Sequence, residues 1–201
     1  MQAKQHLDRV YQAQSPQELR QAYGEWAAAY DQDLVEGMGW DKPVRVGQAL
    51  LPFLPPPSAQ PAILDVGAGT GLVGQFLFDH GYQNLSAGDF CPAMLAQAGQ
   101  RKVYRQLLEM DLNLPLDLPE GHFEAITAVG IFTEGHLGPA CLQELCRVLK
   151  RGGHLAFSLR DDLQPLYAAH QAALPCDLCL RQAFSDGLES RPWSAWIYRL
   201  R

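Results

Sequence analysis

The sequence predicts an α/β protein in which helices cover both faces of a mostly parallel β-sheet. The run Ile63-Leu64-Asp65-Val66 is typical of a central strand that is buried on both faces. A glycine-rich turn follows it directly, with glycines at Gly67, Gly69 and Gly71. Beyond residue 71, helical and strand-like patterns alternate, which is typical of parallel strands joined by helices.

Residues 1–57 show no strand-like alternation, so we expect them to be helical and to precede a core of residues 58–201, in a single domain overall. Ser15-Pro16-Gln17-Glu18 has the pattern of a capping box and predicts a helix over about residues 16–30. Its apolar residues share one face, and they are Leu19, Tyr23, Trp26, Ala27 and Tyr30. Pro55-Pro56-Pro57 should stop helix formation before the sheet.

The glycine turn has the composition of a ligand-binding loop. Glycines let the backbone approach a ligand, while the start of the following helix directs its amides and its positive dipole there. Two patterns overlap: G-x-G-x-G over Gly67, Gly69 and Gly71, and G-x-G-x-x-G over Gly69, Gly71 and Gly74. The carboxylate of Asp65 would repel a pyrophosphate, so the first pattern favours a ligand that carries an ammonium group.

A second acidic residue lies where a nucleotide-binding unit needs one. Asp89 is 18 residues beyond Gly71 and ends a predicted strand over 84–89, a position that accepts hydrogen bonds from ribose hydroxyls. The remaining strands are expected near 103–108, 123–129 and 154–160 and twice within 179–201, and the helices at 72–80, 139–150 and 161–174.

Together these landmarks, over about residues 60–160, resemble the motifs of class I methyltransferases that use S-adenosyl-L-methionine and release S-adenosyl-L-homocysteine. The resemblance implies a Rossmann-like seven-stranded sheet whose last strand is antiparallel. Tyr23-x-x-Trp26-x-x-x-Tyr30-Asp31 resembles a helical lid found in small-molecule members, although an aromatic stripe that only docks its helix is the alternative. Together with 129–130 and 134–137, this segment also resembles methyltransferase-like proteins linked to the Williams-Beuren chromosomal region.

The resemblance implies cofactor contacts along the ends of the strands. Phe90 and Met94 would flank the adenine, and Asp111 would meet its amino group. Ordinary core packing is the alternative for Met94, and a solvated loop position is the alternative for Asp111. The full set expected to bind the cofactor is Tyr30, Asp65, Gly67, Ala68, Gly69, Gly71, Asp89, Phe90, Met94, Met110, Asp111, Leu112, Val129 and Gly130.

The loop after the strand at 123–129 should border the methyl group, because open α/β sheets bind ligands at the carboxyl ends of their strands. The residues expected to bind the acceptor are Tyr23, Trp26, Phe132 and Glu134. His136 is the candidate general base because it lies in this loop and titrates near neutral pH. Capping of the next helix is its alternative role, and Glu134 is the second candidate base.

Composition narrows the partners. Sixteen basic and 22 acidic residues give a net charge of −6, which does not favour nucleic acid or an anionic membrane. The sequence has no long apolar run and no signal-peptide pattern, so we expect a cytoplasmic protein. We expect it to be a monomer or a homodimer. The five cysteines are scattered, and Cys176-x-x-Cys179 lacks further ligands, so we expect free thiols and no metal.

The sequence therefore predicts an S-adenosylmethionine-dependent methyltransferase that acts on a nitrogen, oxygen or sulfur atom of a small molecule. The pattern Gly69-x-Gly71-x-x-Gly74 with Asp89 leaves an NAD-dependent oxidoreductase as one alternative. A non-catalytic protein that retains a degenerate methyltransferase fold is the other, because a fold alone does not establish an activity.

Overall fold

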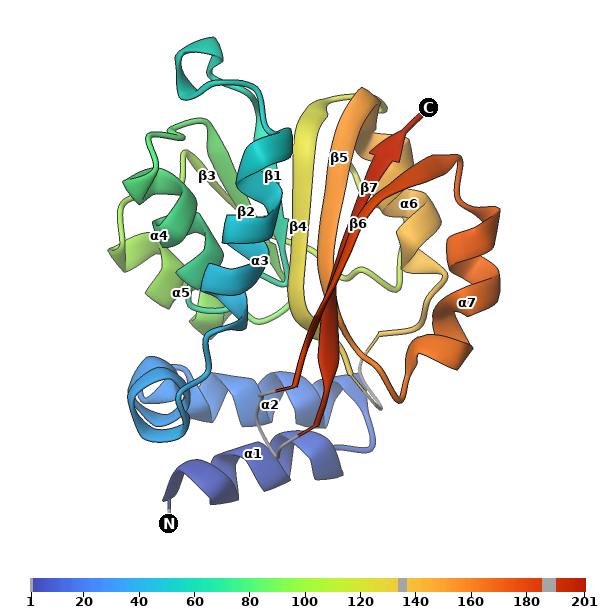
Figure 1. Cartoon of the computed structure of the whole chain (residues 1–201). Helices are drawn as coiled ribbons and strands as arrows, with labels where there is room; N and C mark the ends of the chain where they lie inside the picture. The colour runs from blue at the N-terminus through green and yellow to red at the C-terminus, as the bar shows by residue number, and fades with distance from the viewer. Residues whose placement is uncertain (1, 134–136, 186–190) are drawn as a thin grey trace.

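The computed structural model describes residues 2–133, 137–185 and 191–201. A seven-stranded sheet with the order β3-β2-β1-β4-β5-β7-β6 forms its centre (Figure 1). The strands are β1 (Ile63–Val66), β2 (Leu85–Asp89), β3 (Gln106–Glu109), β4 (Phe123–Phe132), β5 (Leu149–Arg160), β6 (Cys176–Phe184) and β7 (Trp193–Leu200). Strands β1 to β5 pair in parallel, and β7 runs antiparallel to both β5 and β6, which confirms the predicted sheet.

Helices cover both faces because successive residues of a buried strand point in opposite directions. Ile63 packs in a cluster with Val46 and Leu77, whereas Leu64 packs on the other face with Leu142 and Phe157. The first face is covered by α3 (Lys42–Leu50) and α4 (Leu72–Asp79), and the second by α6 (Cys141–Val148) and α7 (Gln164–Ala173). A fifth helix, α5 (Pro92–Gln100), packs against β2 and β3.

The neighbouring strands β1 and β4 form the switch point of the sheet. From β1 the chain proceeds outward to β2 and β3, and it then returns to β4 and continues outward on the other side to β5. The loops after β1 and β4 therefore leave the sheet in opposite directions, and the crevice between them is where open α/β sheets bind ligands.

Residues 2–40 form helices and turns at the carboxyl ends of the parallel strands (Figure 1). This N-terminal helical segment (residues 2–40) contains α1 (Gln2–Gln12), α2 (Pro16–Trp26) and the π-helix η1 (Gln32–Glu36). The predicted cap is confirmed, because the Glu18 amide donates to Ser15 Oγ at 3.2 Å and the Glu18 carboxylate accepts from the Gln14 amide at 2.9 Å. The prediction that this helix continues to about residue 30 was wrong, since α2 ends at Trp26 and a turn leads into η1.

The segment before the sheet divides into two parts by its packing. Helix α3 lies on the sheet itself, with Val46 and Leu50 completely buried. After α3 come two short 3₁₀ helices, η2 (Leu51–Phe53) and η3 (Pro57–Ala59), around the proline triplet. No helix in the described ranges is long and apolar enough to cross a membrane.

The most marked difference from the predicted elements lies at β5. A helix was expected to reach residue 150 and a glycine turn to precede the strand, but α6 ends at Val148 and β5 begins at Leu149. The pairing shifts between Phe123 with Leu149 and Ala125 with His154. Gly152, with φ +78°, lies in this irregularity, so the glycines shape a bulge inside the strand instead of a turn before it.

Candidate functional site

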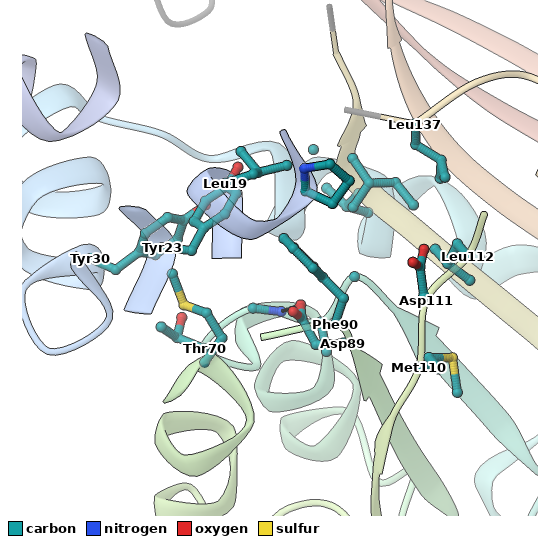
Figure 2. Close-up of a pocket in the computed structure, with 18 of the residues that line it drawn as sticks. Leu19, Tyr23, Tyr30, Thr70, Asp89, Phe90, Met110, Asp111, Leu112 and Leu137 are labelled. Carbon is teal, nitrogen blue, oxygen red and sulfur yellow. Dashed lines mark hydrogen bonds between the residues drawn. The ribbon is translucent and has the colours of Figure 1, made fainter. Parts of the chain in front are cut away.

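A cavity of about 400 Å³ lies between the N-terminal helical segment and the carboxyl ends of the parallel strands. In Figure 2, Tyr23 and Tyr30 of the N-terminal helical segment lie at one end, with Thr70 of the glycine turn nearby. Asp111 and Leu112, which follow β3, lie at the other end, and Asp89 and Phe90 lie between. The cavity thus spans the tips of several strands at the switch point, as expected for a ligand site in this class of fold.

The glycines of the turn have different roles. Gly67, Gly69 and Gly71 all have left-handed backbones, with φ of +61°, +54° and +87°. A Cβ on Gly69 would have none of the described atoms beyond its chain neighbours within 4 Å, so this position opens onto the cavity. In contrast, a Cβ on Gly71 would lie 2.9 Å from the Tyr104 ring and one on Gly74 would lie 2.1 Å from it. In the G-x-G-x-x-G pattern, Gly71 and Gly74 therefore leave room for the Tyr104 side chain.

Asp89 links the end of β2 to the glycine turn. Its Oδ2 accepts a hydrogen bond from the Gly69 amide at 2.8 Å, and its Oδ1 accepts one from the Cys91 amide at 2.9 Å. Burial raises the pKa of this carboxyl group, while the amide hydrogen bonds act in the opposite direction. The side chain lines the cavity although it is only 6% exposed, so it presents a fixed acceptor to a ligand.

Asp65 lies behind the turn and does not line the cavity. It is 2% exposed, and its carboxylate accepts hydrogen bonds from the Tyr104 hydroxyl and from Thr127 Oγ1, both at 2.7 Å. Burial raises its pKa to about 6. The Tyr104 hydroxyl also accepts from the Gly74 amide at 3.1 Å, so Asp65 orders the turn and the following helix. A direct contact between this carboxylate and a ligand's ammonium group was expected, and the structure does not provide it.

The tips of β2 and β3 provide the wall predicted for a nucleotide base. Phe90, Met94, Met110, Asp111 and Leu112 all line the cavity. Met94 also packs beneath it in a small buried cluster, so its core role and its cavity role coexist. Asp111 lies in the loop after β3, where it is partly exposed and lines the cavity, and its Oδ1 accepts from the backbone amide two residues later at 2.9 Å.

Four aromatic side chains form a continuous wall of the cavity. The ring centroids of Phe90 and Tyr23 are 6.2 Å apart, those of Tyr23 and Tyr30 are 6.3 Å apart, and those of Tyr30 and Trp40 are 6.2 Å apart. The first and last contacts are edge to face, the geometry that aromatic pairs favour. We call Phe90, Tyr23, Tyr30 and Trp40 the aromatic wall.

Trp26 does not belong to this wall, although it was expected to bind the acceptor. It is 1% exposed and does not line the cavity, and its Nε1 donates to Asp33 Oδ2 at 2.8 Å. Its ring packs against Tyr30 at a centroid distance of 4.8 Å. Trp26 therefore supports a wall residue from behind, which is the packing role proposed as the alternative for the aromatic stripe.

Asp31 connects the N-terminal helical segment to the core. Thr70 Oγ1 donates a hydrogen bond to Asp31 Oδ1, and the Arg101 guanidinium forms an ion pair with Asp31 Oδ2. Arg101 Nε also donates to the Thr70 carbonyl oxygen at 2.6 Å. These three residues, which we call the Asp31 junction, join the segment, the glycine turn and the end of α5.

The end of β4 borders the cavity, as predicted. Val129, Gly130 and Ile131 line it, and Gly130 has a left-handed backbone with φ +78°. A Cβ on Gly130 would lie 3.0 Å from the Trp40 ring, so the glycine lets the indole approach the strand. The Gly130 amide donates to Ser158 Oγ at 2.9 Å, which fixes this backbone.

Four other predicted residues are not among the described residues that line the cavity. Phe132, which was expected to bind the acceptor, is 1% exposed, packs in the core against Phe157 and Tyr167, and does not line the cavity. Glu134 and His136 lie outside the described residues. Gly71, as shown above, packs against a side chain and does not line the cavity.

Further lining residues were not predicted. They are Ala13, Gln14, Ser15, Pro16, Leu19, Trp40, Pro43, Thr70, Leu72, Val73 and Asn113, whereas Ile131 and Leu137 line the cavity within the segment predicted to border the methyl group. The glycine motif and its following helix could have indicated Thr70, Leu72 and Val73. By contrast, the capping box located a helix start without showing that the loop between α1 and α2 reaches the sheet.

Comparisons with known proteins agree with this geometry. Residues 64–157 match the model of a methyltransferase domain. Human methyltransferase-like protein 27 is 32% identical over 182 residues, which cover 87% of this chain and 74% of the human protein. This similarity favours S-adenosylmethionine over NAD as the cofactor.

Solved structures show the same fold at low sequence identity. An S-adenosylmethionine-dependent methyltransferase from Leishmania major superposes with a TM-score of 0.69 at 13% identity, over 97% of this chain and 89% of that one. A TehB-like S-adenosylmethionine-dependent methyltransferase from Corynebacterium glutamicum superposes with a TM-score of 0.63 at 17% identity, over 90% of this chain and 100% of that one. A structure solved as a complex between the Haloferax volcanii Trm112 methyltransferase activator and a methyltransferase superposes with a TM-score of 0.66 at 13% identity, over 88% of this chain and 96% of that one. The chain belongs to the class I S-adenosylmethionine-dependent methyltransferases.

Proposed function

We propose that the protein transfers the methyl group of S-adenosylmethionine to a small-molecule acceptor held in the same cavity. The observation that carries the proposal is the pairing of Asp89 with Gly69: a buried carboxylate lies beside a glycine whose missing side chain leaves space toward the cavity. A ribose needs a hydrogen-bond acceptor, and a closely approaching ligand needs a bare backbone, so the residues fit this cofactor.

Each part of the cofactor has a proposed partner. Asp89 would accept hydrogen bonds from the ribose hydroxyls, and the backbone from Gly67 to Gly69 would hold the amino-acid part. Phe90 and Met94 would flank the adenine, and Asp111 would accept from its amino group. The lining positions of Met110 and Leu112 support the same placement of the adenine, and those of Ala68, Val129, Gly130 and Tyr30 support placement of the sulfonium near the end of β4.

When bound, S-adenosylmethionine supplies a methyl group that passes to a lone pair of the acceptor, leaving S-adenosylhomocysteine and releasing the acceptor's proton. The contribution of this chain is to position the acceptor and to exclude water. The aromatic wall and the loop between α1 and α2 cover the ends of the strands and would limit access of water. His136 and Glu134 remain the candidate bases for acceptors that must lose a proton before attack.

Two observations support a small acceptor. The cavity lies beneath residues 13–16 and Leu19, and this cover favours a compact partner over a macromolecule. The net charge of −6 gives no general attraction for nucleic acid. By analogy with small-molecule members of the superfamily, the N-terminal helical segment would act as a lid.

Calorimetry with S-adenosylmethionine, S-adenosylhomocysteine and NAD tests the cofactor, since we expect the first two to bind and NAD to bind much more weakly. Pools of small nucleophiles and, separately, protein and RNA substrates can then be screened for formation of S-adenosylhomocysteine. Turnover with small molecules alone would support the proposal. Turnover that requires a protein or RNA would contradict the small-molecule acceptor without affecting the cofactor result.

A further inference from the structure

The charged residues of the cavity all have the same sign. Among the described lining residues there is no lysine, arginine or histidine, and the charged side chains are Asp89 and Asp111. Both carboxylates lie at the tips of β2 and β3, the part of the cavity proposed for the cofactor. The part that remains for an acceptor therefore has no described positive charge to pair with an anion.

The wall beside the end of β4 is apolar. Trp40, Pro43 and Ile131 line it, and the indole of Trp40 lies against Gly130. Two contacts hold Trp40 in place. Its ring meets the Tyr30 ring edge to face at a centroid distance of 6.2 Å, and its backbone amide donates to the Leu34 carbonyl oxygen at 2.9 Å. A fixed, flat, apolar side chain next to the expected methyl position is suited to contact an apolar ligand.

We infer that the acceptor is an uncharged, largely apolar small molecule that rests against Trp40, and that molecules carrying a carboxylate or a phosphate are excluded. This inference rests on the proposed function and specifies the substrate class of the same site. Beside S-adenosylhomocysteine, which carries no sulfonium charge, an anion would lose its hydration against the apolar wall, and the described lining offers no lysine, arginine or histidine to pair with it. A protonated amine would also lose its hydration against the apolar wall, and it has no lone pair with which to attack a methyl group.

Three probes that share one ring system and differ in charge test the inference by binding alone. They are 2-naphthol, 2-naphthoate and 2-naphthylmethylammonium, each titrated at neutral pH by fluorescence into the full-length protein saturated with S-adenosylhomocysteine. We expect 2-naphthol to bind at least about tenfold more tightly than 2-naphthoate. Equal or tighter binding of the naphthoate would overturn the inference, as would tighter binding of the ammonium probe or no detectable binding of 2-naphthol.

Two variants locate the site. Trp40→Ala should weaken the binding of 2-naphthol by roughly tenfold, whereas Trp40→Phe should retain most of the affinity. Leu178 is an exposed residue of β6 outside the cavity lining, so Leu178→Ala should leave the affinity unchanged. Ile131→Lys places a cation in the apolar wall and should reverse the preference toward 2-naphthoate, whereas Leu178→Lys should not. Because the reversal is a gain of binding, loss of folding cannot imitate it.

The affinity for S-adenosylhomocysteine is measured in parallel for each variant. If the wild-type protein does not bind S-adenosylhomocysteine, the proposed function fails before the probes are added. If S-adenosylhomocysteine binds but the protein does not prefer 2-naphthol over the charged probes, only the inference about the acceptor fails. An unchanged 2-naphthol affinity in a folded Trp40→Ala variant that still binds S-adenosylhomocysteine would also overturn it.

Discussion

The Asp89 carboxylate accepts a hydrogen bond from the Gly69 amide at 2.8 Å, which joins the two most informative positions of the sequence in one interaction. One lies at the tip of β2 and the other in the turn after β1, and parallel pairing of β1 with β2 brings them together. A ligand that touches the open side of Gly69 therefore also meets the carboxylate that holds Gly69 in place.

Replacement of Asp89 should weaken cofactor binding. Asp89→Ala removes the acceptor proposed for the ribose hydroxyls and the partner of the Gly69 amide, so we expect S-adenosylhomocysteine to lose roughly 1.5 to 3 kcal/mol of binding free energy. Asp89→Asn keeps one oxygen acceptor and should lose less. Calorimetry on the folded variants measures both, and a loss below about 0.5 kcal/mol for Asp89→Ala would show that the ribose binds elsewhere.

Gly69→Ala should affect binding far more than stability. Its backbone, at φ +54°, makes any other residue cost about 1 kcal/mol, but the added methyl group projects into the cavity. Gly121→Ala is the matched control, since Gly121 has φ +62°, no described non-neighbouring atom within 4 Å of its Cβ, and no place in the cavity lining. Urea unfolding should show similar losses of stability for the two, with reduced S-adenosylhomocysteine affinity only in Gly69→Ala. Equal affinities of the two variants for S-adenosylhomocysteine would show that Gly69 does not contact the ligand.

Sequence patterns located the main elements because each depends on short-range signals. The glycine turn, the acid after β2 and the capping box at Ser15 are all local, and the structure places each where it was expected. The start of β5 was missed because its first residues pair across a bulge with β4, and that pairing depends on residues more than 20 positions away.

Within the site, side-chain roles depended on partners that the sequence does not place. Three spaced glycines look alike in sequence, and only the position of Tyr104 shows that Gly69 faces the cavity while Gly71 packs against the tyrosine ring. Similarly, helical spacing put Trp26 and Tyr30 on one face, but Asp33 holds the indole inside the helical cluster. Long-range contacts decide which member of a correct pattern meets a ligand.

Asp65 should make stability depend on pH. Its pKa is raised to about 6 in the folded protein, so between about pH 4 and about pH 6 the folded state holds a proton that the unfolded state has lost. The free energy of unfolding should therefore fall as the pH rises through this window, by about 2 to 3 kcal/mol from this residue, and then level off. Above about pH 6 the charged carboxylate remains, stabilised in part by Tyr104 and Thr127.

The difference between wild type and Asp65→Asn isolates this residue, because other titrating groups contribute equally to both. Urea unfolding at several pH values should show the wild type losing stability relative to Asp65→Asn between about pH 4 and about pH 6. Asp177→Asn, an exposed position of β6, should run parallel to the wild type. Parallel curves for Asp65→Asn would show that the burial of Asp65 does not control its protonation.

The Asp31 junction should hold the N-terminal helical segment over the cavity. If the segment acts as a lid, S-adenosylhomocysteine should slow proteolysis of residues 1–57, because the aromatic wall then gains a partner. Arg101→Gln removes the ion pair with Asp31 and weakens the contact with the Thr70 carbonyl. We expect faster cleavage of this region and a loss of about 1 kcal/mol in S-adenosylhomocysteine affinity.

Arg9→Gln is the control, since the Arg9–Glu25 ion pair joins two helices within the segment and does not reach the core. It should leave both cleavage and affinity close to those of the wild type. Tyr30→Ala distinguishes a lid from ordinary packing. If the aromatic wall closes over the ligand, this variant should lose both the protection from proteolysis that S-adenosylhomocysteine gives and part of the affinity for it, because the same ring lines the cavity and contacts Trp40. If Tyr30→Ala lowers the free energy of unfolding while the folded fraction binds S-adenosylhomocysteine as tightly as before, the aromatic wall stabilises the segment and does not close over the ligand.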